Sequence, residues 1–127
     1  MTRRLLRVVL AELGSEDAED AEDHENVAIV LGRLLRDDGV EVVYAGRLET
    51  VEHLIRTVEQ EDPDILGVVG TTAGTGGLAR ALPDVLLFAV GDRPGGIENV
   101  FETAEQAANW VSGVRSHTVE TPSDRIR

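Results

Sequence analysis

Short, nearly unbroken apolar runs alternate along the chain with longer segments in which apolar residues recur every three or four positions. An unbroken apolar run is typical of a strand that is buried on both faces of a parallel sheet. We predict four such strands and a short fifth strand, at residues 5–11, 40–44, 65–69, 85–90 and 99–101.

The segments between these strands have the spacing of amphipathic helices. The first helix is predicted to end at Asp38, before Gly39, and the second to follow Thr50, a favourable N-cap residue. A short third helix is predicted at residues 78–82. The last helix starts at residues 103–106, which have the form of a capping box. The apolar faces comprise Val27, Val30, Leu31, Leu34 and Leu35; Val51, Leu54, Ile55 and Val58; and Ala104, Ala107, Ala108, Val111 and Val114.

Strands that alternate with helices at this spacing predict an α/β fold. We expect a flavodoxin-like, doubly wound parallel sheet of about five strands in the order 2-1-3-4-5, with helices on both faces. The length of 127 residues fits one domain. We place that domain at residues 1–115 and expect a loose polar tail at residues 116–127.

Small, polar or glycine-rich turns follow the predicted strands, at Ala45-Gly46, Gly70–Gly77 and Gly91–Gly96. In an open α/β sheet such turns gather at the carboxyl edge, where ligands bind. The link at residues 12–26 lies beside the expected switch point. Its acidic repeat at residues 16–23 has neither the turn glycines nor the ligand spacing of a calcium loop, and we interpret it as a solvated loop or an extended helix N-terminus.

The charge and composition exclude several classes of function. The chain has 24 Asp and Glu residues against 12 Arg, no Lys, and a net charge of −12. This acidity argues against nucleic-acid binding and suggests a halophilic origin, where salt screens the repulsion between carboxylates. The absence of cysteine excludes thiolate metal sites. Without a membrane-length apolar run or a signal peptide, we expect a soluble, cytoplasmic protein.

Residues 7–70 resemble the cobalamin-binding domain of methylmalonyl-CoA mutase and of the separate small subunits of related mutases. The resemblance is carried by His24 and by the segments Gly32–Gly39, Val40–Gly46 and Glu59–Gly67, and the helix at residues 104–114 fits the last helix of that family. The fold that this resemblance implies is the one predicted above.

The family marks its cofactor site with Asp-x-His-x-x-Gly, then Ser-x-Leu, then a pair of glycines. The resemblance makes His24 the lower ligand of cobalt, with Glu22 at the Asp position. Val27 replaces the glycine of this motif, Val69-Gly70-Thr71 stands at Ser-x-Leu, and Ala89-Val90 stands at the glycine pair. The implied cofactor-binding residues are Glu22, His24, Val27, Gly70, Thr71, Thr72 and Gly91.

The resemblance implies a module that carries adenosylcobalamin for a mutase whose acyl substrate binds to a separate (β/α)₈-barrel subunit. No complete catalytic site is expected in this chain. The valines at motif positions leave an alternative, a degenerate relative that acts as a non-catalytic assembly or regulatory partner, with His24 as a surface histidine. A response-regulator receiver is discounted, because the third strand ends at Val69-Gly70 without an aspartate and the chain has no lysine.

Overall fold

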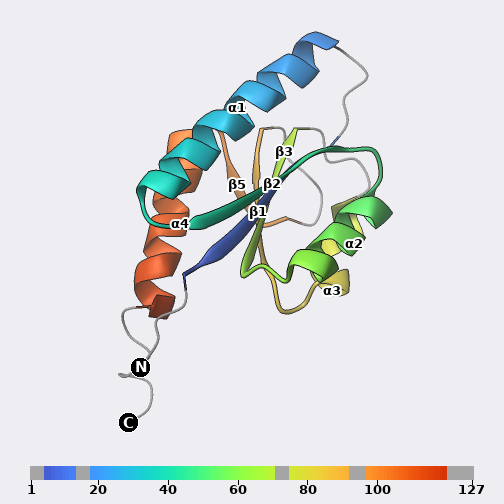
Figure 1. The fold of residues 1–127 in the computed structure, drawn as a ribbon. Helices are drawn as coiled ribbons and strands as arrows, with labels where there is room; N and C mark the ends of the chain where they lie inside the picture. The colour runs from blue at the N-terminus through green and yellow to red at the C-terminus, as the bar shows by residue number, and fades with distance from the viewer. Residues whose placement is uncertain (1–4, 14–17, 71–74, 92–96, 120–127) are drawn as a thin grey trace.

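The computed structural model describes residues 5–13, 18–70, 75–91 and 97–119. Its centre is one sheet of parallel strands in the order β2-β1-β3-β4-β5 (Figure 1). The strands are β1 (Arg7–Leu13), β2 (Glu41–Leu48), β3 (Ile65–Gly70), β4 (Leu86–Val90) and β5 (Asn99–Phe101). The predicted strand order and the flavodoxin-like architecture are confirmed.

Helices cover both faces of the sheet, as Figure 1 shows. On one face lie α1 (Ala18–Asp37) and α4 (Ala104–Val119), and on the other lie α2 (Val51–Glu61), the short 3-10 helix η1 (Thr75–Gly77) and α3 (Leu78–Ala81). None of the described helices is long and apolar enough to cross a membrane.

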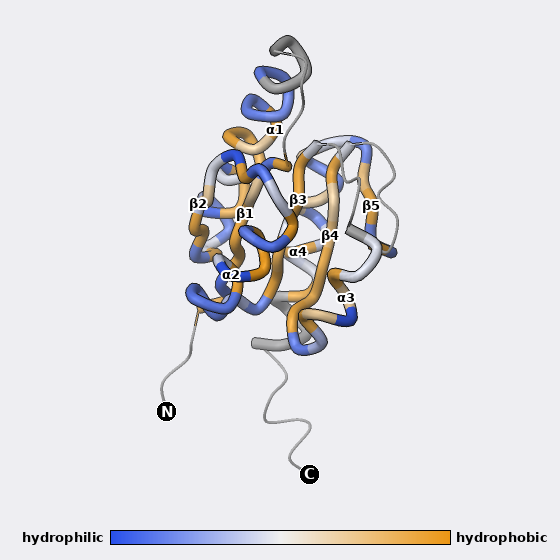
Figure 2. Tube along the Cα trace, turned by 90° about the vertical axis from the view of Figure 1, so that its right-hand side faces the viewer, coloured by the Kyte–Doolittle hydropathy of each residue, from blue (hydrophilic) through white to orange (hydrophobic). Residues whose placement is uncertain are grey.

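Each face of the sheet has its own apolar core, because side chains along a strand point alternately to opposite faces. On β1, Val8 and Leu10 pack toward α1 and α4, while Val9 and Ala11 pack toward α2 and α3. The central strands β3 and β4 are apolar along most of their length (Figure 2). Burial on both faces explains why these strands have unbroken apolar sequences.

Two helices begin at the caps predicted from the sequence. The hydroxyl of Thr50 accepts a hydrogen bond from the backbone N–H of His53 at 3.0 Å. At the start of α4, the Thr103 hydroxyl accepts from the N–H of Gln106 at 3.1 Å, and the Gln106 side chain accepts from the N–H of Glu102 at 2.9 Å. Both caps satisfy donors that would otherwise lack partners in the first helical turn.

Several predicted boundaries are wrong. The turn expected at Ala45-Gly46 lies inside β2, where the register with β1 shifts and Gly46 adopts a φ of +79°. Such a bulge lets a strand continue through a glycine whose sequence pattern predicts a turn. The link expected at residues 12–26 is shorter, because β1 runs to Leu13 and α1 begins at Ala18. Helix α4 continues to Val119, so residues 116–119, expected in the tail, are helical.

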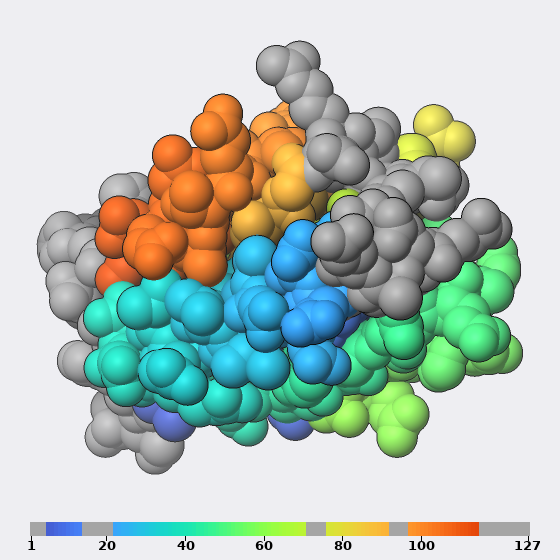
Figure 3. All heavy atoms as spheres, turned by 90° about the horizontal axis from the view of Figure 1, so that it is seen from above, coloured from blue at the N-terminus to red at the C-terminus, as the bar shows by residue number. Residues whose placement is uncertain are grey.

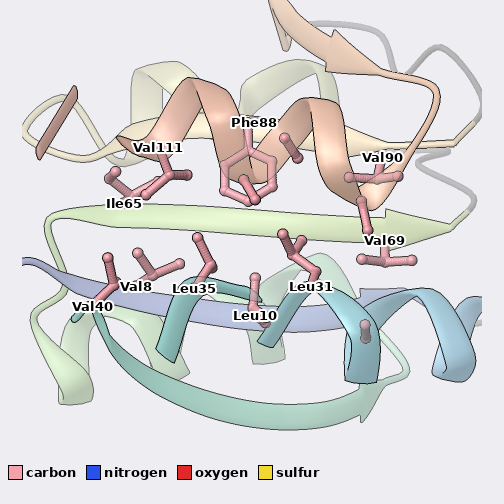
Figure 4. Close-up of a cluster of buried hydrophobic side chains, with 14 of the residues drawn as sticks. Val8, Leu10, Leu31, Leu35, Val40, Ile65, Val69, Phe88, Val90 and Val111 are labelled. Atoms are coloured by element: carbon pink, nitrogen blue, oxygen red, sulfur yellow. The ribbon is translucent and has the colours of Figure 1, made fainter. Parts of the chain in front are cut away.

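One core glycine is required by close packing. Gly67 of β3 faces α1 and α4, and a Cβ there would collide with the ring of Phe88 and lie 2.8 Å from Cδ2 of Leu10. Phe88 also contacts the half-buried Trp110 of α4, with 5.7 Å between ring centroids. Figure 4 shows Phe88 between β3 and α4, within the apolar core of that face.

We therefore expect Gly67→Ala to lower the free energy of unfolding by about 1–3 kcal/mol, because the added methyl group overpacks the core. Gly113→Ala is the control, since its Cβ would have no neighbour within 4 Å on the exposed side of α4. Urea unfolding should show that this variant is unchanged or more stable by up to about 1 kcal/mol. Equal stability of Gly67→Ala and wild type would contradict the packing described here.

Candidate functional site

His24 lies in the second turn of α1, on the side of the helix that faces the sheet. It precedes Ala28, Leu31 and Leu35 by four, seven and eleven residues, and these three side chains are buried. Residues at this spacing share one helix face. The imidazole is therefore directed inward and is half-buried, in contrast to the surface histidine considered as an alternative above.

The imidazole of His24 rests on the backbone at the carboxyl end of β3. A Cβ on Gly70 would lie 2.7 Å from Nδ1 and 3.0 Å from Cε1 of His24, and 3.1 Å from the carbonyl oxygen of Leu13. Gly70 also has a φ of +110°, which disfavours any residue with a side chain. The ring can occupy this place only because residue 70 is a glycine.

A second glycine adjoins the first at the same edge. Gly91, directly after β4, has a φ of +121°, and a Cβ there would lie 3.7 Å from the backbone nitrogen of Gly70. The structure thus brings together three residues that the sequence suggested for one site, His24, Gly70 and Gly91. Figure 3 looks onto this carboxyl edge, with α1 in cyan to blue and α4 in orange.

The other suggested site residues lie apart from this group or outside the described part of the chain. Glu22 is exposed and precedes His24 by two residues, which places it about 200° around the helix. Its carboxylate therefore faces away from the imidazole. Val27 is half-buried and packs against the apolar core, while Thr71 and Thr72 lie outside the described residues.

Sequence reasoning missed a buried carboxylate next to the end of β1. Glu12 is only 3% exposed and accepts a hydrogen bond from the hydroxyl of Tyr44 on β2. Glu12 lies two residues after Leu10 on β1, so the two side chains share one face of the sheet. Leu10 packs toward α1, and Glu12 therefore lies on the same face as His24. The signal in the sequence that could have indicated this buried carboxylate is its position directly after the apolar run at residues 5–11.

Burial raises the pKa of Tyr44, and the hydrogen bond to Glu12 and the negative charges of Glu12 and Glu25 raise it further, while Arg47 lowers it. The phenol therefore stays protonated at physiological pH and remains a donor to Glu12. This pair fixes β2 against β1 beside the candidate site.

His24 supplies a single nitrogen ligand. No hydrogen bond or ion pair links its imidazole to another residue in the described part of the chain, and no three His, Asp or Glu side chains are grouped there as for a metal ion. A lone imidazole holds a free metal ion poorly. It can, however, complete the coordination of a metal whose other ligands come from a macrocycle.

The fold and this edge together define a flavodoxin-like α/β domain with one inward-facing imidazole at the switch point of its sheet. Known proteins of the same fold are similar to it.

The chain is 38% identical over 68 residues to the 2-hydroxyisobutanoyl-CoA mutase small subunit of Aquincola tertiaricarbonis, a match that spans 54% of this chain and 46% of that subunit. It is 28% identical over 114 residues to the pivalyl-CoA mutase small subunit of Xanthobacter autotrophicus, spanning 87% of this chain and 73% of that subunit. No family model matches the sequence. The resemblance to mutase small subunits noted from the sequence is confirmed.

Solved structures confirm the fold. A cobalamin-binding protein from Desulfitobacterium hafniense superimposes with a TM-score of 0.66 at 16% identity, covering 85% of this chain and 58% of that one. A type II dehydroquinase from Propionibacterium acnes superimposes with a TM-score of 0.61 at 12% identity, covering 84% of this chain and 98% of that one. The same fold thus serves different functions, and function must be argued from the site.

The contact between His24 and Gly70 predicts the outcome of a matched pair of substitutions. Gly70→Ala and Gly91→Ala impose similar backbone strain, of about 1–3 kcal/mol each, because both residues have positive φ. Only the Gly70→Ala methyl group meets the imidazole. We expect diethyl pyrocarbonate to modify His24 several-fold faster in Gly70→Ala and at the wild-type rate in Gly91→Ala.

Peptide mass mapping measures this rate for each histidine separately. His53, exposed on α2, is the internal reference and should react equally in all three proteins. Equal acceleration of His24 in both variants would indicate general loosening of the edge and would contradict the specific contact.

The hydrogen bond between Tyr44 and Glu12 predicts how much Tyr44→Phe lowers the free energy of unfolding and how this effect depends on pH. Tyr44→Phe removes a donor from a buried carboxylate and should lower the free energy of unfolding at neutral pH by about 1–3 kcal/mol. Because folding raises the pKa of Tyr44 above its ordinary value of 10.0, wild-type stability is complete below that pH and is lost as the pH rises above it.

The chain has one tyrosine, no lysine and no cysteine, so Tyr44 is the only side chain expected to titrate in this alkaline range. Urea unfolding at increasing pH should therefore show an alkaline loss of stability in wild type that is absent in Tyr44→Phe. Parallel curves for the two proteins would mean that the phenol is not coupled to Glu12.

Proposed function

We propose that this chain is a cobalamin-binding module of the mutase small-subunit type, in which His24 is the lower axial ligand of cobalt. The observation that carries the proposal is the placement of one half-buried imidazole on Gly70, at the edge where flavodoxin-like sheets bind ligands. The similarity to two mutase small subunits supports it independently.

The residues at this edge suit a corrinoid. An imidazole is a good ligand for cobalt, and a corrin supplies the remaining equatorial ligands that the described part of the chain does not. Gly70 and Gly91 place no side chain at the ends of β3 and β4, which favours close approach of a broad planar ring to the backbone at these two positions. In this role the chain holds and orients the ring, with Gly70 setting the position of the His24 imidazole.

The cofactor form that fits a mutase is adenosylcobalamin, which when bound supplies radical chemistry. In this role the chain contributes binding and axial ligation. The match spans 46% of the first mutase small subunit described above. Both similar mutase proteins are small subunits, and we propose that a separate large subunit, of the (β/α)₈-barrel type, binds the substrate and docks over the carboxyl edge.

Titration of the purified protein with hydroxocobalamin in molar KCl tests the proposal, because replacement of the ligand on cobalt changes the corrin absorption spectrum. We expect wild type to bind with the spectrum of imidazole ligation. His24→Ala should lose that spectrum and at least about tenfold in affinity, equivalent to about 1.4 kcal/mol. His53→Ala, a substitution on the exposed side of α2, is the matched control and should behave as wild type.

Binding that is unaffected by His24→Ala would remove His24 from its proposed role. A wild-type protein that takes up no corrinoid would favour the alternative, a non-catalytic assembly or regulatory partner with the same fold. Circular dichroism of each variant would show that loss of binding does not reflect loss of folding.

A further inference from the structure

Aliphatic side chains fill the layer directly beneath the His24 imidazole. Val69 precedes Gly70 on β3 and is 1% exposed, and Val90 precedes Gly91 on β4 and is 3% exposed. Both belong to the core between the sheet and the helices α1 and α4, and Figure 4 shows them together at one end of that core. Val27 of α1 and Ala104 of α4 pack against the same core.

Helices α1 and α4 close this layer from outside. They contact each other over the same core. The hydroxyl of Ser112 on α4 donates to a carboxylate oxygen of Asp38 at 2.8 Å, at the end of α1 that is remote from His24. Figure 3 shows atoms of the two helices in contact, with atoms of the β4–β5 region between them nearer the edge. At the ends of β3 and β4, the core between the sheet and these helices is occupied by Val69 and Val90, which are almost fully buried.

Cobalamin carries a lower tail whose chemistry does not match this layer. The tail contains a phosphate, a ribose and a benzimidazole base, and burial of its charged and hydroxyl groups requires hydrogen-bond donors. Glu12 is the only polar side chain that is fully buried among the described residues, and its carboxylate would repel a phosphate. Among the described residues, this layer therefore offers an inserted tail no buried side-chain donor.

We infer that this domain binds a corrinoid by its ring and cobalt alone, and leaves the nucleotide tail outside the space between α1 and the sheet. This inference rests on the proposed function, since it assumes that His24 ligates cobalt. The residues responsible for excluding the tail are Val27, Val69 and Val90.

Exclusion of the tail has a measurable consequence for corrinoid choice. A tail that is not held by the protein remains free to return its own base to the lower face of cobalt, where it competes with His24. Cobinamide has the same ring but no nucleotide, so it has no competing base. The domain should therefore bind cobinamide at least as tightly as cobalamin, whereas a domain that buries the tail should prefer cobalamin.

The experiment compares diaquacobinamide with hydroxocobalamin by absorption titration of wild type, His24→Ala and Val69→Thr. We expect cobinamide to bind wild type with equal or higher affinity, and to lose affinity in His24→Ala. Val69→Thr nearly keeps the side-chain volume and adds a hydroxyl donor. Residue 69 stands where the Ser-x-Leu motif of the mutase family has its serine. Val69→Thr should leave the ratio of the two affinities unchanged, because no tail reaches this residue.

A preference of wild type for cobalamin by about tenfold or more would overturn the inference while leaving the proposed function intact. A selective gain of cobalamin affinity in Val69→Thr would overturn it as well, since it would place the tail beside residue 69. Failure of wild type to bind either corrinoid would overturn the proposed function and this inference together.

Discussion

The candidate site depends on one contact, in which the imidazole of His24 lies against the backbone of Gly70. The two residues come from different layers, a helix and a central strand, and each is fixed by its own surroundings. His24 is aligned with three buried residues of α1, while Gly70 ends a strand paired on both sides. A side chain at residue 70 would displace the ring, so the glycine determines where the imidazole can stand.

This contact gives the edge its chemical character. Next to the imidazole, two glycines with positive φ, Gly70 and Gly91, place no side chain at the ends of β3 and β4. Val69 and Val90 contribute to an aliphatic core on the same face, and Glu12, the one buried carboxylate among the described residues, accepts a hydrogen bond from Tyr44. Among the described residues, one nitrogen ligand beside two glycines and an apolar core suits a metal that arrives inside a macrocycle. This reasoning links the packing of the core to the choice of ligand.

The sequence predicted the elements of the fold well, because unbroken apolar runs, Thr50 and the capping box at Thr103 are local signals. It also singled out His24, Gly70 and Gly91. It could not show that Gly46 continues β2 through a bulge, since the same glycine also fits a turn. The sequence could not show that Glu22 faces away from His24. That orientation follows from both residues lying in α1, which begins as early as Ala18. The pairing of Glu12 with Tyr44 depends on strand register, which no local pattern reveals.

The most direct test of the account is electron paramagnetic resonance of the protein loaded with cob(II)alamin, after its histidines have been labelled with ¹⁵N. The unpaired electron on cobalt reports the nitrogen bound on its lower face. The account predicts doublet splitting from ¹⁵N, which His24→Ala abolishes. Triplet splitting from the unlabelled base of the cofactor would contradict it, because cobalt would then be ligated by the nucleotide tail and not by the imidazole that Gly70 positions.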